Sequence, residues 1–124
     1  MRKLVPLLLA MIMAATMFVT AATAETYTET VQGMFEGMVV EVTLNEGRIE
    51  SVEVKEHMET STGWSAIELL PDRIVETQSI GIDGIAGATM TSNGIKAAVE
   101  AALIEAGLDV AEYQTPSEPA ENLD

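Results

Sequence analysis

The sequence predicts a small α+β domain in which a small antiparallel sheet has its helices packed on one face. Residues 37–55 contain two strand-like runs joined by a tight turn. Residues 93–106 carry apolar side chains at helical spacing and end at a glycine. The expected order of elements is strand–strand–helix–strand–helix, which does not alternate as a parallel doubly wound sheet would.

The hairpin is predicted by alternating hydrophobicity. Apolar side chains on one side of the first strand, residues 37–44, are Met38, Val40, Val42 and Leu44. Residues 45–47 form the turn, since Gly47 tolerates the positive φ that a tight turn needs. The second strand, residues 48–55, is expected to point Val52 and Val54 inward. Because Ile49 breaks the alternation, we expect a β-bulge near Glu50 and Ser51.

The other elements follow from local signals. They are a hydroxyl-rich loop over 56–63, a short helical turn over 64–70, a second helix over 71–78 and a short strand over 79–82. Pro71 suits the first position of that second helix, because its missing N–H has no helical partner there. The last helix, over 93–106, is expected to end at Gly107.

The N-terminal 24 residues have the features of a secretory signal peptide. Arg2 and Lys3 are followed by an uncharged run over 4–24 that ends in Ala-Thr-Ala, a small-residue cleavage site. We expect cleavage near Ala24 and an extracytoplasmic mature protein, in the periplasm, on the cell surface or secreted. The alternative is an uncleaved membrane anchor, since the uncharged run is long enough to span a bilayer.

The mature chain divides into three parts. Residues 25–32 are expected to be a polar lead-in, residues 33–107 the folded domain, and residues 108–124 an acidic disordered tail. Removal of Arg2 and Lys3 from the six bases leaves four bases against twenty acids, a net charge of −16.

Composition excludes several classes of protein. The chain has no cysteine and a single histidine, so a disulfide framework, an iron–sulfur cluster and a multi-histidine metal centre have no residues to form them. We therefore expect no metal. Its strong negative charge would repel nucleic acid, which we do not expect as a partner.

Residues 83–92 carry the clearest chemical signal. This segment joins a strand to a helix, contains Gly84 and Gly87, and places hydroxyl groups at the helix N-terminus. Those hydroxyl residues are Thr89, Thr91 and Ser92. Unpaired N–H groups and the positive end of the helix dipole make such a position suitable for phosphate. The alternative is that Ser92 or Asn93 simply caps the helix.

The stretch D-G-I-A-G-A-T-M-T-S-N-G-I resembles the flavinylation motif of the FMN-binding domain family. That family includes the FMN-carrying subunits of sodium-translocating NADH:quinone reductase and of the Rnf complex. The motif's aspartate corresponds to Asp83, its core to Gly87, Ala88 and Thr89, and its acceptor threonine to Thr91. Ala86 stands where the family usually has Ser or Thr. The resemblance covers about residues 33–104.

The resemblance implies an electron carrier, not an enzyme, that holds FMN covalently on Thr91 through a phosphoester. A separate, magnesium-dependent FAD:protein FMN transferase would attach the FMN, since no base is expected beside Thr91. The redox partner would be a membrane or extracytoplasmic flavin- or quinone-linked reductase. Two alternatives stay open: a reversible flavin-binding module, and a structural or interaction domain whose motif is not modified.

The resemblance also assigns further residues to the cofactor site. They are Glu59, Thr60, Gly63 and Trp64 in the upstream loop, and Asp83 and Ser92 within the motif segment. For Trp64 the alternative to flavin stacking is a place in the core, the commoner position for a lone tryptophan. His57 is expected to be a solvated or structural histidine, and Met90 is expected to pack in the core beneath the loop.

Overall fold

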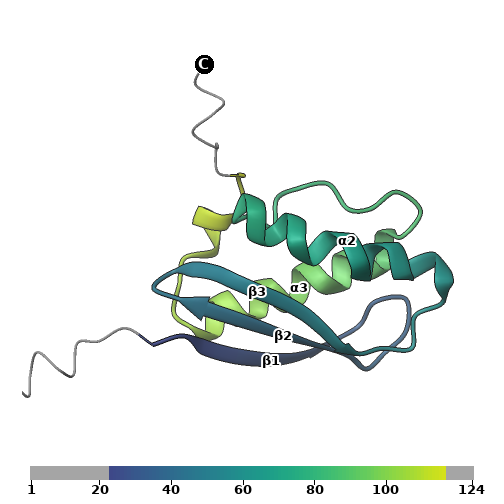
Figure 1. Cartoon of the computed structure of the whole chain (residues 1–124), viewed down its shortest axis with the longest axis horizontal. Helices are drawn as coiled ribbons and strands as arrows, with labels where there is room; N and C mark the ends of the chain where they lie inside the picture. The colour runs from purple at the N-terminus through teal and green to yellow at the C-terminus, as the bar shows by residue number, and fades with distance from the viewer. Residues whose placement is uncertain (1–22, 117–124) are drawn as a thin grey trace, which may run out of the picture.

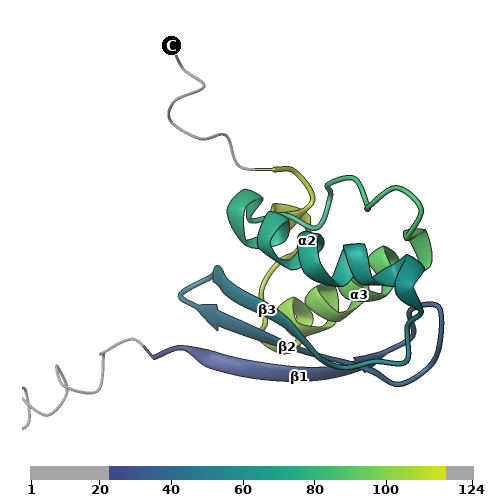
Figure 2. The same ribbon diagram turned by 45° about the vertical axis from the view of Figure 1, so that its right-hand side comes forward.

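The computed structural model describes residues 23–116. Its elements, in chain order, are β1 (Glu25–Val31), β2 (Met38–Asn45), β3 (Arg48–Glu56), α2 (Ser61–Thr77), α3 (Thr89–Glu105) and the short 3-10 helix η1 (Val110–Tyr113). The strands form one antiparallel sheet in the order β1-β2-β3. Both long helices pack on the same face of this sheet (Figures 1 and 2), which confirms the predicted fold class.

The hairpin of β2 and β3 matches its prediction closely. Side chains of β2 alternate between buried and half-buried positions along its whole length. Thr43 pairs with Ser51 and Leu44 pairs with Ile49, which leaves Glu50 unpaired in a bulge, as expected. The bulge turns Ile49 into the core, where it is fully buried.

The first strand was not predicted. Residues 25–31 do not form a polar lead-in; they form the edge strand β1, in register from Glu25 opposite Leu44 to Val31 opposite Met38. One face of β1 points to solvent, so its sequence is largely polar. Tyr27 and Val31 on the other face are partly buried against the core.

Helix α2 is one continuous helix, not the two predicted. It runs from Ser61 to Thr77 with Pro71 in its interior. Pro71 removes one backbone hydrogen bond, yet its own side chain is buried beside Leu70 and close to Ile74. Burial of this apolar stripe outweighs the lost hydrogen bond, since each fully buried aliphatic side chain contributes about 1.5–3 kcal/mol.

The segment after α2 is also not the predicted strand. The backbone of Ile80 donates to the carbonyl of Tyr113, and the Ser79 hydroxyl donates to the same carbonyl at 2.9 Å. Residues 79–82 therefore attach to the C-terminal segment instead of the sheet.

The C-terminal segment is ordered further than predicted. Residues 110–113 form η1, and the buried Tyr113 donates its hydroxyl to the carbonyl of Gly47 in the hairpin turn. The predicted disordered tail is thus wrong for residues up to 113. The part of that tail beyond residue 116 lies outside the described residues. The predicted signal peptide also lies outside them up to residue 22.

Helix α3 lies across the sheet and carries the core's most regular stripe. Its fully buried apolar residues are Ile95, Ala98, Val99, Ala102 and Leu103. The helix begins at Thr89, four residues earlier than predicted, so Thr91 and Ser92 lie within its first turn. Within residues 23–116, no helix is both long enough and apolar enough to cross a bilayer.

Candidate functional site

The N-termini of α2 and α3 meet at a cleft of about 250 Å³. Three segments line it: Met34 in the β1–β2 loop, Thr62 and Gly63 at the start of α2, and residues 87–91 of the motif. Among residues 23–116, no charged side chain lines the cleft. The sequence motif therefore faces a concave surface that two helix N-termini share.

Thr91 is held by a buried carboxylate. Its hydroxyl donates to Oε1 of Glu59 at 2.5 Å, and Thr91 is only 1% exposed. Glu59 also accepts the backbone N–H of Met34 at 2.8 Å and of Phe35 at 3.2 Å. A base therefore lies directly beside Thr91, contrary to the expectation from the sequence.

The environment keeps Glu59 ionised. Burial raises the pKa of Glu59, but the hydrogen bonds from Thr91, Met34 and Phe35 stabilise its carboxylate and outweigh the effect of burial. The charge of His57, whose Nδ1 accepts the Glu59 N–H, acts in the same direction. The pKa of Glu59 consequently lies below its ordinary value.

The motif loop presents backbone donors to the cleft. Gly87 has a φ of 83°, a conformation that favours glycine, and this turns the chain into α3. The N–H of Ser92 donates to Ala88 at 2.9 Å and so begins the helical pattern. The preceding N–H groups in the first turn, those of Thr89, Met90 and Thr91, have no acceptor within an α-helix. They form the positive end of the helix dipole.

Ser92 has a different role from the predicted one. It is fully buried, and its hydroxyl accepts the N–H of Ile85 at 2.9 Å, which closes the motif loop onto the helix. The N-cap position belongs to Ala88, with no side-chain cap, so neither Ser92 nor Asn93 caps α3.

Gly63 allows the two helix starts to approach each other. A Cβ atom at Gly63 would overlap Thr91 Oγ1 and would lie 3.3 Å from Glu59 Cβ. The glycine predicted from the family pattern is thus required by this close contact.

Large apolar side chains are exposed on or next in sequence to the residues that line the cleft. Trp64 is 51% exposed and Met90 52% exposed, so the expectation that Met90 packs in the core is wrong, as is the core alternative for Trp64. The indole Nε1 of Trp64 donates to the carbonyl of Glu59 at 3.0 Å, which fixes the ring beside the site. Met34 and Phe35 are also exposed, and no sequence pattern had assigned either residue to the site.

Five of the predicted site residues do not line the cleft: Glu59, Thr60, Trp64, Asp83 and Ser92. Thr60 precedes α2, and its hydroxyl lies 4.0 Å from Sδ of Met34, a residue that does line the cleft. Asp83 is exposed at the start of the motif loop. Both belong to the surroundings of the site.

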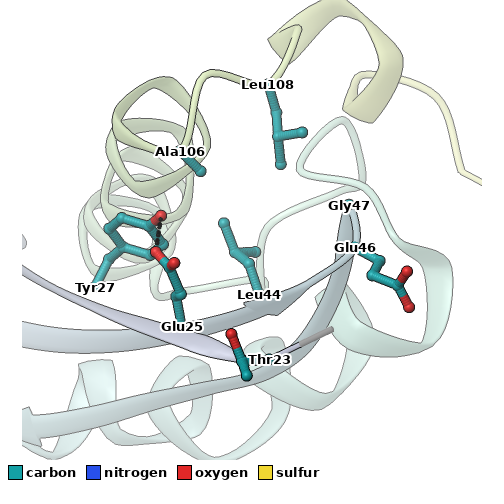
Figure 3. A pocket seen from close by; sticks show the side chains of 8 residues that line it. All are labelled: Thr23, Glu25, Tyr27, Leu44, Glu46, Gly47, Ala106 and Leu108. Carbon is teal, nitrogen blue, oxygen red and sulfur yellow. Dashed lines mark hydrogen bonds between the residues drawn. The ribbon is translucent and has the colours of Figure 1, made fainter. Parts of the chain in front are cut away.

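A second cavity, of about 220 Å³, lies at the far end of α3, between Ala106 and the hairpin turn (Figure 3). The carboxylates of Glu25 and Glu46 line it, and Tyr27 donates its hydroxyl to Glu25 at 2.9 Å. No basic side chain of the described part of the chain lines this cavity. Its negative charge disfavours phosphate, whereas the cleft at the helix N-termini favours it.

Comparison with known protein families identifies the domain. The model of the FMN-binding domain matches residues 33–104. The chain belongs to the FMN-binding domain family. Membership supports FMN as the cofactor and fits the role of an electron carrier. Within the described residues 23–116, no group of three or more metal-ligating side chains comes together.

The residues of the cleft fit one end of FMN. Free N–H groups at the start of α3 suit a phosphate, and the small volume suits the phosphate better than the whole cofactor, because pockets for complete ligands usually exceed about 300 Å³. The exposed apolar side chains of Met34, which lines the cleft, and of Trp64 and Phe35, which hydrogen-bond to Glu59, offer a surface for an aromatic ring system.

Proposed function

We propose that this protein is an extracytoplasmic electron carrier with FMN covalently attached to Thr91 through a phosphoester. The observation that carries the proposal is the position of the Thr91 hydroxyl. It lies at the cleft, in the first turn of α3, next to backbone N–H groups that can receive a phosphate.

The chain's own residues would bind and orient the cofactor. The N–H groups of Thr89, Met90 and Thr91 would hold the phosphate, while Gly63 and Gly87 keep side chains out of its path. Trp64 and the neighbouring apolar side chains would contact the ring. The bound FMN supplies the redox chemistry, and the protein supplies attachment, orientation and local electrostatics.

The proposal includes two kinds of partner. A separate FAD:protein FMN transferase attaches the cofactor, and a membrane or extracytoplasmic flavin- or quinone-linked reductase exchanges electrons with it. The twenty acidic residues of the chain, against four bases after residue 24, would suit a basic docking surface on that reductase. The signal peptide predicted for residues 1–24 supports an extracytoplasmic location.

Intact mass under denaturing conditions tests the attachment. The chain is produced together with an active FAD:protein FMN transferase, and we expect a mass increase of one FMN phosphoryl group. Thr91→Val should abolish the increase, whereas Thr91→Ser should retain it. Thr89→Val, which removes the neighbouring hydroxyl of the same cleft, is the matched control and should be modified like the wild type.

An unmodified wild-type mass, with the transferase active on another acceptor, would contradict covalent attachment. Flavin that stays bound under native conditions and separates on denaturation would then identify the protein as a reversible flavin-binding module.

A further inference from the structure

The hydrogen bond between Thr91 and Glu59 defines where the hydroxyl proton points. The Thr91 hydroxyl is the donor, so its proton lies between Oγ1 and Oε1 of Glu59, 2.5 Å apart. The lone pairs of Oγ1 then point away from Glu59. This is the arrangement in which a carboxylate can accept a proton while the oxygen attacks an electrophile.

The backbone of Gly33 and Gly63 packs tightly against this pair. A Cβ atom at Gly63 would overlap Thr91 Oγ1, and one at Gly33 would lie 2.5 Å from Glu59 Oε1. Even a methyl group does not fit at these two positions, so Glu59 is the carboxylate that the fold places against the Thr91 hydroxyl.

Glu59 is also in the correct protonation state. Three hydrogen bonds hold its carboxylate, and its pKa lies below the ordinary value, so at neutral pH it is ionised and able to accept. Carboxylates perform the same task in protein kinases, where an aspartate accepts the proton of the substrate hydroxyl.

We propose that Glu59 is the general base for the modification of Thr91, so that the acceptor protein supplies a catalytic group for its own flavinylation. This inference rests on the proposed function and deepens it. The transferase would bind and activate the flavin dinucleotide, while the base comes from the chain that is modified.

The step balances as a phosphoryl transfer from FAD. Thr91 Oγ1 forms a bond to the phosphorus of the FMN half as the phosphoanhydride bond breaks. AMP leaves with the bridging oxygen and its electron pair. The hydroxyl proton passes to Glu59 Oε1 and from there to solvent. No oxidant or reductant takes part.

Single-turnover flavinylation measures this role. The full-length chain is mixed with excess transferase and saturating FAD, and the flavinylated fraction is followed by intact mass. We expect Glu59→Gln, which keeps the shape and a carbonyl acceptor, to slow the step by about a hundredfold or more, as loss of a general base does. Glu59→Asp, which keeps a carboxylate, should recover part of the rate. Glu56→Gln, an exposed glutamate nearby, should react like the wild type.

The pH profile separates a base from a structural residue. The rate of the wild type and of Glu56→Gln should fall on the acid side as Glu59 becomes protonated, and this limb should be missing for Glu59→Gln. If Glu59→Gln does not fold, Gly33→Ala decides by the same rate criterion, because its Cβ displaces the Glu59 carboxylate.

The outcomes are distinguishable. A folded Glu59→Gln chain that is flavinylated within twofold of the wild-type rate overturns the inference and leaves the proposed function intact. A Glu59→Gln chain that keeps the acid limb of the wild-type pH profile, with Glu59→Asp no faster than Glu59→Gln, also overturns it. A wild-type chain that accepts no FMN from an active transferase contradicts the proposed function and this inference with it.

Discussion

The hydroxyl of Thr91 donates to the carboxylate of Glu59 at 2.5 Å, across 32 positions of sequence. This one contact joins the start of α3 to the loop before α2. The same carboxylate accepts the N–H groups of Met34 and Phe35, so the β1–β2 loop is attached to it as well. Three segments of the cleft thus depend on the ionised state of one buried side chain.

Gly63→Ala should disturb this contact. In a helix, alanine is ordinarily more favourable than glycine by about 1 kcal/mol. Here the added Cβ overlaps Thr91 Oγ1, so we expect a lower melting temperature and slower FMN attachment. Thermal denaturation and intact mass measure the two effects. Ser61→Ala, at an exposed position of the same turn, is the control. A melting temperature for Gly63→Ala at or above that of the wild type would show that the contact is not tight.

Trp64 should report on the flavin. It is the single tryptophan of the chain, and its exposed ring is fixed beside the cleft by the hydrogen bond to Glu59. We expect strong quenching of tryptophan emission when Thr91 carries FMN. Thr91→Val with an equal concentration of free FMN controls for light absorption by the flavin. Equal emission from the two samples would mean that the ring lies elsewhere.

Glu29 should make stability fall as pH rises. Burial is the main cause that raises the pKa of Glu29 to about 7, and the nearby Glu105 carboxyl on α3 adds to it. Because the folded-state pKa lies above the unfolded value, the folded chain keeps the proton longer. Stability is then highest below the unfolded pKa and decreases up to about pH 7.

Replacement of Glu29 by glutamine tests whether the titration of Glu29 causes this pH dependence of stability. Glu29→Gln should have a higher melting temperature than the wild type at pH 8 and a similar one at pH 4. The exposed Glu100→Gln, also a loss of one negative charge, should change the pH dependence far less. A parallel pH dependence of Glu29→Gln and the wild type would contradict the assignment.

Tyr113→Phe should destabilise the domain without affecting flavin attachment. The phenol donates to the carbonyl of Gly47 and so fastens η1 to the hairpin turn. Its loss should lower the free energy of unfolding by about 1 kcal/mol, measured by chemical denaturation. Tyr27→Phe, which removes an exposed hydrogen bond to Glu25, should cost less. Equal losses of unfolding free energy in the two variants would argue against a stabilising role for the Tyr113–Gly47 hydrogen bond.

The local sequence was sufficient to predict those elements in which apolar residues recur at regular spacing. The alternation along β2 predicted its inward face, and the departure at Ile49 predicted the bulge at Glu50. The helical spacing of Ile95, Val99 and Leu103 predicted α3. In each case the spacing of apolar residues within one short segment is enough to show which face of the element is buried.

Elements stabilised by distant contacts were missed. Strand β1 is a polar edge strand whose pairing with β2 is its main stabilising contact, and η1 is held by Ser79 and Gly47. Pro71 indicated the start of a helix because proline is common at that position. The tertiary packing of Leu70, Pro71 and Ile74, which keeps α2 continuous across the proline, is not visible in the local sequence.

The site was predicted only in part for the same reason. The motif located Thr91 and Gly87, and the family pattern located Glu59 and Gly63. The pairing of Glu59 with Thr91 comes from the tertiary arrangement of two helix starts, which no spacing in the sequence encodes.

The most direct test of the account is to locate the flavin on the chain after reaction with the transferase. Trypsin cleaves after Arg73 and after Lys96, which releases Thr91 in the peptide 74–96. We predict that this peptide alone carries the FMN phosphoryl mass and that fragmentation assigns it to Thr91. Flavin on another residue of that peptide, such as Thr89, or on a different peptide would contradict the account.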